Sequence, residues 1–555
     1  MKTPLKSLVG LLAAPLPIIA IVGASPATAQ STPAVGQQVA VHGDVVPAAG
    51  RSTRLGAVAS DKRISVAVSL APRDRAGLNA FLAQVHDPKS PQYKHYLTVK
   101  QFAARFGASA ASIAATTAYL SSQGLSVGKV YGGHLVIDAT GSAAQVEKAF
   151  HVALSTFRDS RTKRDFYANT TDPTLPRGLA ANIVDVSGLN NYAQLKHFDK
   201  RNTAAAHQKS HAKSHAVSGL TPTQALAAYD LTSENSNGYT GSGQTIGLVE
   251  FSSFSQSNID TYDSNFSLSP STPSVVSIDG GTTDTSGEGE VELDIEVIQA
   301  LAPGANIKVY EAPNSTAGDT DLYAALVSAD VPIVSISWGQ SESSTTSSSR
   351  SSDENAFSEA SAQGQSVFAA SGDNGSDDAG DGTTSVDFPA SDQYVTGVGG
   401  TTLSTDSSGN YSGETAWSGS GGGTSALYAQ PSYQSGVTSD TNRDVPDVSA
   451  VADPSTGWAI YTSGAWAEYG GTSAAAPNWA AFTAIYDQYA AAKGGSALGY
   501  ANSSIYALAS GSNYSTAFHD VTSGSNGSFS AGTGYDQVTG WGSYDGANFI
   551  TASLG

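Results

Sequence analysis

Cysteine is absent from this chain of 555 residues. Without a thiol the protein has no disulfide framework, no thiolate nucleophile and no cysteine-based zinc or iron–sulfur site. Charged residues are also scarce, at 14% of the chain, and the net charge is −20. An acidic surface repels a phosphate backbone, so nucleic acid is excluded as the main partner.

Long apolar runs are missing everywhere except at the N-terminus. Two lysines precede the apolar stretch 8–22, and small residues follow it up to Ala29. The stretch is shorter than a membrane span and contains Pro15 and Pro17. We therefore predict a signal peptide over residues 1–29 and a secreted, extracellular product that has no membrane contact once the signal is removed.

Positive charge is almost missing from the second part of the chain. Residues 1–215 contain 24 Lys and Arg against 11 Asp and Glu, whereas residues 216–555 contain 4 against 37. Single cores rarely grow beyond about 250–300 residues, so the chain has more than one domain. The charge division suggests two units with complementary surfaces.

The first unit, residues 30–199, mixes strand-like alternation such as 64–69 with helical runs and predicts a small α+β domain. Residues 200–216 are basic and polar, and predict a linker in which processing takes place. His207, His211 and His215 are spaced by four, so they suit either a metal site on one helix face or a solvated, protease-accessible segment. Apolar runs at 244–250 and 331–337 in residues 217–555 predict a doubly wound α/β domain with a parallel sheet.

The clearest local motif is Gly-Gly-Thr-Ser-Ala-Ala-Ala-Pro at 470–477, followed by an apolar run. This pattern predicts a buried helix with Ser473 at its N-terminal end, where free backbone N–H groups favour developing negative charge. The small residues around Ser473 permit close approach of a substrate backbone.

A serine nucleophile needs a base, and the acidic run 287–303 offers one. On a helix Glu290 and Asp294 share one face, while Glu292 and Glu296 lie on another. Two adjacent carboxylates share a proton readily. The same run also suits a solvated acidic helix face.

Asp373 follows an apolar run in Ala-Ala-Ser-Gly-Asp, at the carboxyl end of an expected strand, where open α/β sheets form their sites. Its carboxyl group is either a hydrogen-bond donor to an oxyanion or an ordinary turn residue. Motifs for zincins, P-loop proteins and α/β-hydrolases are absent from residues 217–555. His519 is the only histidine there that a neutral Ser-His-Asp peptidase could use.

Taken together, these motifs resemble the sedolisins, or serine-carboxyl peptidases, and in particular their kumamolisin branch. Further matching stretches are SISWGQSE from Ser335 and RDVPDVSAVADP from Arg443. The first domain resembles the family's activation propeptide. The resemblance implies a subtilisin-like catalytic sheet, a ferredoxin-like prodomain, and a monomeric zymogen whose propeptide is an intramolecular inhibitor.

The resemblance also assigns roles to residues. It implies that Ser473 is the nucleophile, that Glu290 is the base with Asp294 in support, and that Asp373 stabilises the oxyanion. It further implies one structural Ca²⁺, bound by the side chains of Asp520 and Asp536 and the carbonyls of Val521, Gly532 and Gly534. Without the resemblance, these residues suit either such a site or a Gly-rich surface loop with two solvated aspartates.

The chemistry fits an endopeptidase that cleaves peptides and activates itself in acid. Histidine is protonated there and accepts no proton, whereas a carboxylate with a pKa near 4 still does. Two alternatives remain open at this point. One is a neutral subtilisin-like peptidase that uses His519, and the other is a secreted, non-catalytic binding protein.

Overall fold

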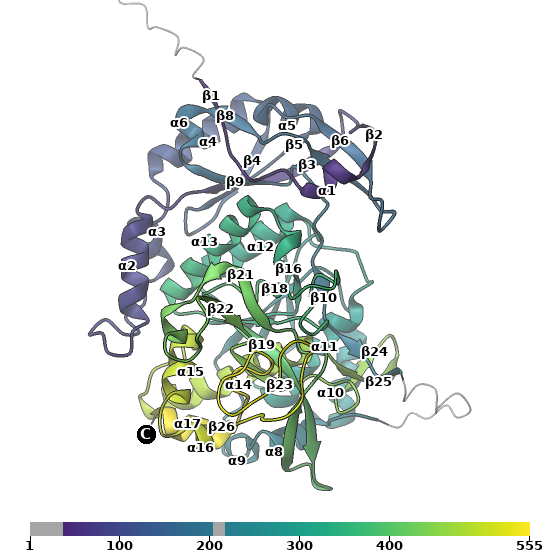
Figure 1. Cartoon of the computed structure of the whole chain (residues 1–555), viewed down its shortest axis with the longest axis vertical. Helices are drawn as coiled ribbons and strands as arrows, with labels where there is room; N and C mark the ends of the chain where they lie inside the picture. The colour runs from purple at the N-terminus through teal and green to yellow at the C-terminus, as the bar shows by residue number, and fades with distance from the viewer. Residues whose placement is uncertain (1–36, 204–216, 555) are drawn as a thin grey trace, which may run out of the picture.

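A computed structural model describes residues 37–203 and 217–554 and shows two domains, with the N-terminal one seated on the larger one (Figure 1). The predicted signal peptide and the histidines at 207, 211 and 215 lie outside the described residues. In the part of the chain that the structure describes, no helix is both long and apolar enough to span a bilayer.

The N-terminal domain is built on an antiparallel sheet in the order β4-β5-β3-β9. Counted along the chain, these are the second, third, first and fourth strands, which is the ferredoxin-like order. Helices α4 and α5 pack their apolar side chains on one face of this sheet. The predicted ferredoxin-like domain is confirmed. Its elements are β3 (Arg63–Leu70), α4 (Ala110–Ser122), β4 (Ser126–Val130), β5 (Val136–Ser142), α5 (Ala143–Phe150) and β9 (Ile183–Ser187).

The other face of this sheet lies on helices α12 (Thr316–Ser328) and α13 (Ser347–Gln363) of the second domain (Figure 1). Ala67 and Val136 belong to the same apolar cluster as Leu322 of α12. The Ser69 and Ser352 hydroxyls are 2.5 Å apart across the boundary. Ion pairs between the domains, within the described residues, come only from the tail of the N-terminal domain.

The second domain contains a sheet in the order β13-β14-β12-β15-β17-β19-β20, and β23 also pairs with β19. All its pairs are parallel except β19 with β20. The predicted doubly wound sheet is confirmed. Its strands are β12 (Thr245–Glu250), β13 (Ser274–Ser277), β14 (Asn306–Glu311), β15 (Ile333–Ile336), β17 (Ser366–Ala370), β19 (Thr396–Thr405), β20 (Tyr411–Ala416) and β23 (Val448–Val451).

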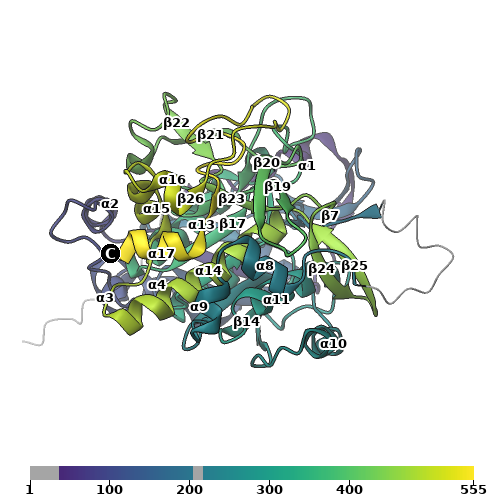
Figure 2. The same ribbon diagram turned by 90° about the horizontal axis from the view of Figure 1, so that it is seen from below.

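Helices cover both faces of this sheet. Helices α12 and α13 lie on the face toward the N-terminal domain, and α11 (Glu288–Leu301) and α14 (Thr472–Lys493) lie on the other, which Figure 2 shows from below. Helix α11 is enclosed on every side, and its residues from Glu290 to Leu301 are all buried. The alternative prediction, that this helix has a solvated acidic face, is therefore wrong. Glu292 accepts a hydrogen bond from Asn258, and Glu296 accepts one from the backbone N–H of Tyr461.

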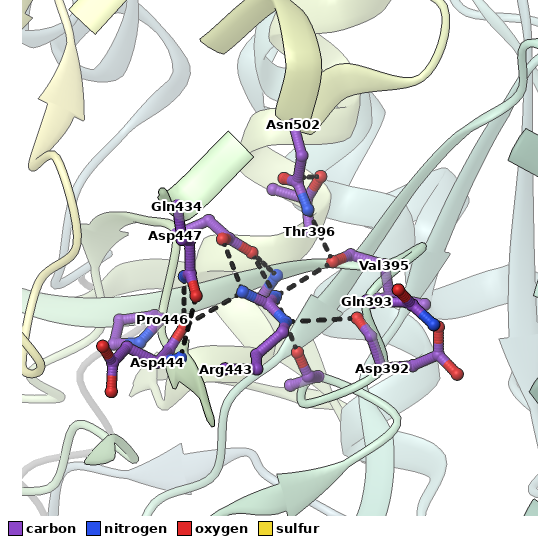
Figure 3. Close-up of polar contacts among 12 residues, drawn as sticks. Asp392, Gln393, Val395, Thr396, Gln434, Arg443, Asp444, Pro446, Asp447 and Asn502 are labelled. Carbon is purple, nitrogen blue, oxygen red and sulfur yellow. Dashed lines mark hydrogen bonds and ion pairs between the residues drawn. The ribbon is translucent and has the colours of Figure 1, made fainter. Parts of the chain in front are cut away.

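A fully buried arginine joins the loop before β19 to β22 (Asn442–Val445) and to the turn between β22 and β23 (Figure 3). The Arg443 guanidinium donates to both carboxylate oxygens of Asp447, at 2.8 and 2.6 Å. Its other contacts are backbone carbonyls, including those of Val395 and Asp392. Because every donor nitrogen has an acceptor, the charge is accommodated without water.

Candidate active site

Ser473 is the second residue of α14 and is fully buried. The helix follows Gly471, whose φ of +98° suits glycine. A Cβ at this position would lie 1.8 Å from the carbonyl oxygen of Phe198. Glycine is therefore required for two reasons, the backbone conformation and the close approach of a second chain segment.

Glu290 and Asp294 lie on the first half of α11 and are both fully buried. Ser337, between β15 and β16 (Trp338–Ser341), connects Asp294 to the serine. Its hydroxyl is 2.9 Å from both carboxylate oxygens of Asp294 and 3.3 Å from the carbonyl oxygen of Ser473. The Ser337 carbonyl in turn accepts a long hydrogen bond, of 3.4 Å, from Ser473 Oγ.

Burial favours the neutral form of the Glu290 and Asp294 carboxyl groups. Burial, followed by the charges of Asp199 and Asp294, raises the pKa of Glu290 well above its ordinary value, and interaction with the Ser473 hydroxyl lowers it. Burial, followed by the charge of Glu250, raises the pKa of Asp294 well above its ordinary value. In the described structure neither carboxylate oxygen of Glu290 has a hydrogen-bond partner. The serine and the glutamate are neighbours, but they are not yet joined by a hydrogen bond.

Asp373 follows β17 and faces the start of α14. Its Oδ1 accepts hydrogen bonds from the Thr472 N–H, at 2.8 Å, and the Thr472 hydroxyl, at 2.9 Å. Its Oδ2 is buried and has no hydrogen-bond partner among the described residues. Burial raises the pKa of Asp373 to about 7, against the opposing effects of Thr472 and Lys200. Since Oδ1 only accepts, a proton on this carboxyl group belongs on Oδ2.

The tail of the N-terminal domain runs through this site as two short strands. β10 (Lys196–His197) pairs antiparallel with β16, and β11 (Lys200–Arg201) pairs antiparallel with β25 (Ala465–Gly470). A peptide bound by backbone pairing on both sides of a serine is held as an extended substrate would be.

Phe198 lies between these two strands, directly at the serine. Its N–H donates to Ser473 Oγ at 3.1 Å, and its carbonyl oxygen lies against Gly471. Asp373 Oδ2 lies on the same side, 2.8 Å from the position of a Cβ on Gly471. The carbonyl of Phe198 therefore faces the carboxyl group that was predicted to stabilise an oxyanion.

Two basic residues of the tail lie beside the acidic groups of the site. His197 Nδ1 is 3.7 Å from Glu290 Oε2 and makes a closer contact with Asp199. Lys200 Nζ is 3.9 Å from Asp373 Oδ2. While the tail is in place, the site contains a blocking backbone, the Lys200 ammonium group beside Asp373 and the His197 ring beside Glu290.

A cavity of about 760 Å³ extends along the tail on the β10 side. Trp338 lines it, with the His197 ring packed edge-on at 5.0 Å. The Trp338 indole donates to Glu250 Oε2 at 2.8 Å. Side chains N-terminal to a cleaved bond would enter this cavity, and Asp284 and Asp378 also line it.

The His519 side chain packs against Tyr411 and makes no hydrogen bond with Ser473 in the described structure. It lies in β26 (Phe518–His519), and its ring stacks on Tyr411 with centroids 3.7 Å apart. Burial lowers the pKa of His519. None of the hydrogen bonds that Ser473 makes within the described residues involves it.

The loop between β26 and β27 (Ser543–Tyr544) brings together the residues that were predicted to bind calcium. Asp536 Oδ2 accepts from the Gly532 N–H at 3.0 Å, and Asp520 accepts from the Gly534 N–H at 3.1 Å. Burial raises the pKa of Asp536. Two carboxylates around a Gly-rich turn, with the carbonyls of Val521, Gly532 and Gly534 in the same loop, form a donor set of oxygen atoms that fits a hard cation.

Two residues of the site were missed from the sequence. Ser337 lies in the stretch SISWGQSE, which carries the resemblance, yet nothing in its spacing shows that it bridges Asp294 and Ser473. Glu250 ends a buried parallel strand, and a carboxylate at that end of a strand is the signal that identifies it. Burial and then the charge of Glu290 raise the pKa of Glu250 well above its ordinary value.

Comparison with known proteins agrees with this geometry. The profile of the Pro-kumamolisin activation domain matches residues 50–192, and that of the subtilase family matches residues 274–535. Kumamolisin of Bacillus sp. (strain MN-32) is 34% identical over 530 residues, covering 90% of this chain and 93% of that protein. Sedolisin of Pseudomonas sp. (strain 101) is 32% identical and covers 88% of this chain and 86% of that protein.

A solved structure gives the same result. Pseudomonas sedolisin, described as a serine-carboxyl proteinase in complex with two molecules of pseudo-iodotyrostatin, aligns with a TM-score of 0.54 at 31% identity. The alignment covers 60% of this chain and 98% of the sedolisin chain. With its activation domain and its subtilase-like peptidase domain, the chain belongs to the sedolisin family of serine-carboxyl peptidases.

Proposed function

We propose that this protein is a secreted endopeptidase that works in acid, with Ser473 as its nucleophile and Glu290 as its general base. The observation that carries the proposal is the position of Phe198, whose backbone lies against Ser473 on one side and toward Asp373 on the other. A peptide held in this way is positioned for acyl transfer to the serine.

In the proposed mechanism the Ser473 oxygen attacks the peptide carbonyl while its proton moves to Glu290. Asp294, held by Ser337, carries a shared proton beside Glu290 and stabilises it. The Oδ2–H of Asp373 donates to the oxyanion. Glu290 then returns its proton to the leaving amine, and water hydrolyses the acyl enzyme by the same route.

Release of the tail prepares the base. After burial, the charge of Asp199 contributes most to raising the pKa of Glu290, and Asp199 belongs to the tail. Once the tail leaves, this contribution disappears and Glu290 loses its proton at a lower pH. A base that ionises in the acidic range suits a peptidase whose substrates are cleaved there.

The test compares Ser473→Ala, Glu290→Gln and His519→Ala in the mature enzyme with a peptide library at pH 3 to 8. We expect the first two to lose at least about 10²-fold in kcat/KM, as loss of nucleophilic or general-base catalysis does. His519→Ala is the matched control and should keep the parent rate. Parent-like hydrolysis by Ser473→Ala would refute the assignment, and a loss confined to His519→Ala would favour a histidine base.

We further propose that Asp520 and Asp536, with the carbonyls of Val521, Gly532 and Gly534, hold one structural Ca²⁺. This loop supports the catalytic strands, because the Tyr535 hydroxyl donates to the Pro446 carbonyl beside Asp447. An ion present at 100 times its Kd stabilises a fold by about 2.7 kcal/mol. In the mature enzyme, a chelator should therefore lower the Tm of the parent but leave that of Asp536→Asn unchanged.

A further inference from the structure

A second group of acidic side chains lies at the boundary between the two domains, apart from the serine. Asp138 is in β5 of the N-terminal domain, Asp321 is in α12, and Asp279 follows β13. One carboxylate oxygen of each lies within 4.8 Å of those of the other two. We refer to these three residues as the interdomain aspartate cluster.

The spacing of these oxygens is that of ligands around one cation. Ca²⁺ binds oxygen at 2.3–2.6 Å, so two ligands on opposite sides of the ion are about 5 Å apart, and adjacent ligands are closer. Three carboxylate oxygens within 4.8 Å fit one coordination sphere. Three ionised carboxylates at this spacing repel one another unless a positive charge lies between them.

The environment of Asp321 is an independent reason to expect a ligand. Asp321 is fully buried, and neither of its carboxylate oxygens has a hydrogen-bond partner in the described structure. Oδ1 of Asp138 is likewise buried without a partner. Buried polar groups are nearly always satisfied in folded proteins, so unpartnered oxygens that lie beside two other carboxylates suit a bound cation.

No basic side chain supplies the missing charge. Among the described residues, no nitrogen of Lys, Arg or His lies within 4.0 Å of any of the three carboxylates. Lys129 is in β4, the strand beside β5, and its Nζ lies 4.5 Å from the centroid of the Tyr131 ring. Tyr131 is next to the cluster but contributes a neutral hydroxyl group.

The cluster is also accessible from solvent. Asp321 closes its inner side, whereas Asp279 is exposed at the surface and Asp138 is partly exposed. A cation entering from the side of Asp279 would keep water as its remaining ligands. This combination of a few carboxylates and several waters is common for Ca²⁺ and Mg²⁺.

We propose that the interdomain aspartate cluster binds a divalent cation of the calcium class, which links the activation domain to the peptidase domain in the proenzyme. One ligand belongs to the activation domain and two belong to the peptidase domain, so the complete site exists only while the domains are together. It is separate from the loop of Asp520 and Asp536. It makes no use of the catalytic residues.

Calorimetric titration of the chelated full-length proenzyme with CaCl₂ at pH 7 tests this inference. Ser473→Ala is the background, which keeps the chain whole. We expect Asp321→Asn and Asp279→Asn each to bind one equivalent fewer than this parent. Asp61→Asn, at an exposed aspartate of the activation domain, is the control and should bind the parental number. Asp536→Asn measures separately the calcium bound by the loop of Asp520 and Asp536.

The outcome that overturns the inference is equally specific. If Asp279→Asn and Asp321→Asn, both folded by circular dichroism, bind as many equivalents as the parent, the cluster binds no cation. A proton shared between Asp321 and Asp279 would then remove the repulsion in place of a cation. If Asp321→Asn fails to fold, the exposed position Asp279 decides the matter alone.

Discussion

The amide nitrogen of Phe198 lies 3.1 Å from the Oγ of Ser473, so the proenzyme presents a peptide from its own activation domain to the proposed nucleophile. The contact lies before the basic segment 200–216 in which we expected processing. The strands on either side of Phe198 hold this peptide extended. Inhibition and the first cleavage therefore involve the same few residues.

The first prediction concerns the bond that is cut. Because the Phe198 carbonyl is directed toward Asp373, acidification should cleave between Phe198 and Asp199 and give a first new N-terminus at Asp199. N-terminal sequencing of the earliest product checks this. Ser473→Ala should give no such product, and a first cut confined to 204–216 would show that the tail is not positioned for attack.

The second prediction concerns Asp373. Replacement by alanine removes the oxyanion donor and should lower kcat by about 10²–10³, with a smaller effect on KM. Asp373→Asn keeps a neutral donor at the same place and should retain more activity. A carboxyl group with a pKa of about 7 donates only below that pH, so the parent should lose kcat as the pH rises through this range.

Asp373→Asn should lack this loss at higher pH, because an amide does not ionise. The measurement is the pH dependence of kcat for the mature parent and both variants with one peptide substrate. Equal losses in Asp373→Asn and Asp373→Ala would mean that the carboxyl group acts by its charge rather than as a donor.

Much of this molecule was predictable from its sequence. Apolar runs such as 244–250 gave the parallel strands, and the motif around Ser473 gave the helix start, because both depend on neighbours in the chain. The burial of Glu292 was not predictable, since it depends on α10 (Gln256–Phe266) and the hairpin of β24 (Trp458–Thr462) and β25 packing over α11. The bridge through Ser337 and the path of the tail likewise depend on residues far apart in sequence.

The third prediction concerns the pH dependence of domain docking. Asp353 of α13 is buried, and neither of its carboxylate oxygens has a hydrogen-bond partner among the described residues. Burial, followed by the charges of Asp319 and Asp185, raises its pKa well above the ordinary value; Asp392 adds to this, and Arg350 opposes it. A raised pKa means that the folded state binds the proton more tightly than the unfolded state, so this stability is present in acid and decreases as the pH rises above the ordinary carboxyl range.

In the Ser473→Ala proenzyme, Asp353→Asn should therefore reduce the decrease in Tm between pH 4 and pH 7. Asp61→Asn, at an exposed position, is the control and should leave that decrease unchanged. Acid would then weaken the ion pairs of the tail, such as Lys200 with Asp373. It would strengthen the contact between the sheet of the N-terminal domain and helices α12 and α13. A steeper pH dependence in Asp353→Asn would contradict this division.

The last prediction concerns the buried pair of Arg443 and Asp447 (Figure 3). Asp447 also accepts from the Gly397 N–H and from the Tyr506 hydroxyl, so the pair connects β19, β22 and α15 (Ala501–Ala509). Arg443→Met leaves Asp447 buried without its counter-charge and should lower the free energy of unfolding by about 3–5 kcal/mol. Arg158→Met is the matched control, since the pair of Arg158 and Asp165 is exposed, and it should change the Tm little. Denaturant unfolding of both variants measures this difference, and equal free energies of unfolding would contradict a role for the Arg443 charge in holding these elements together.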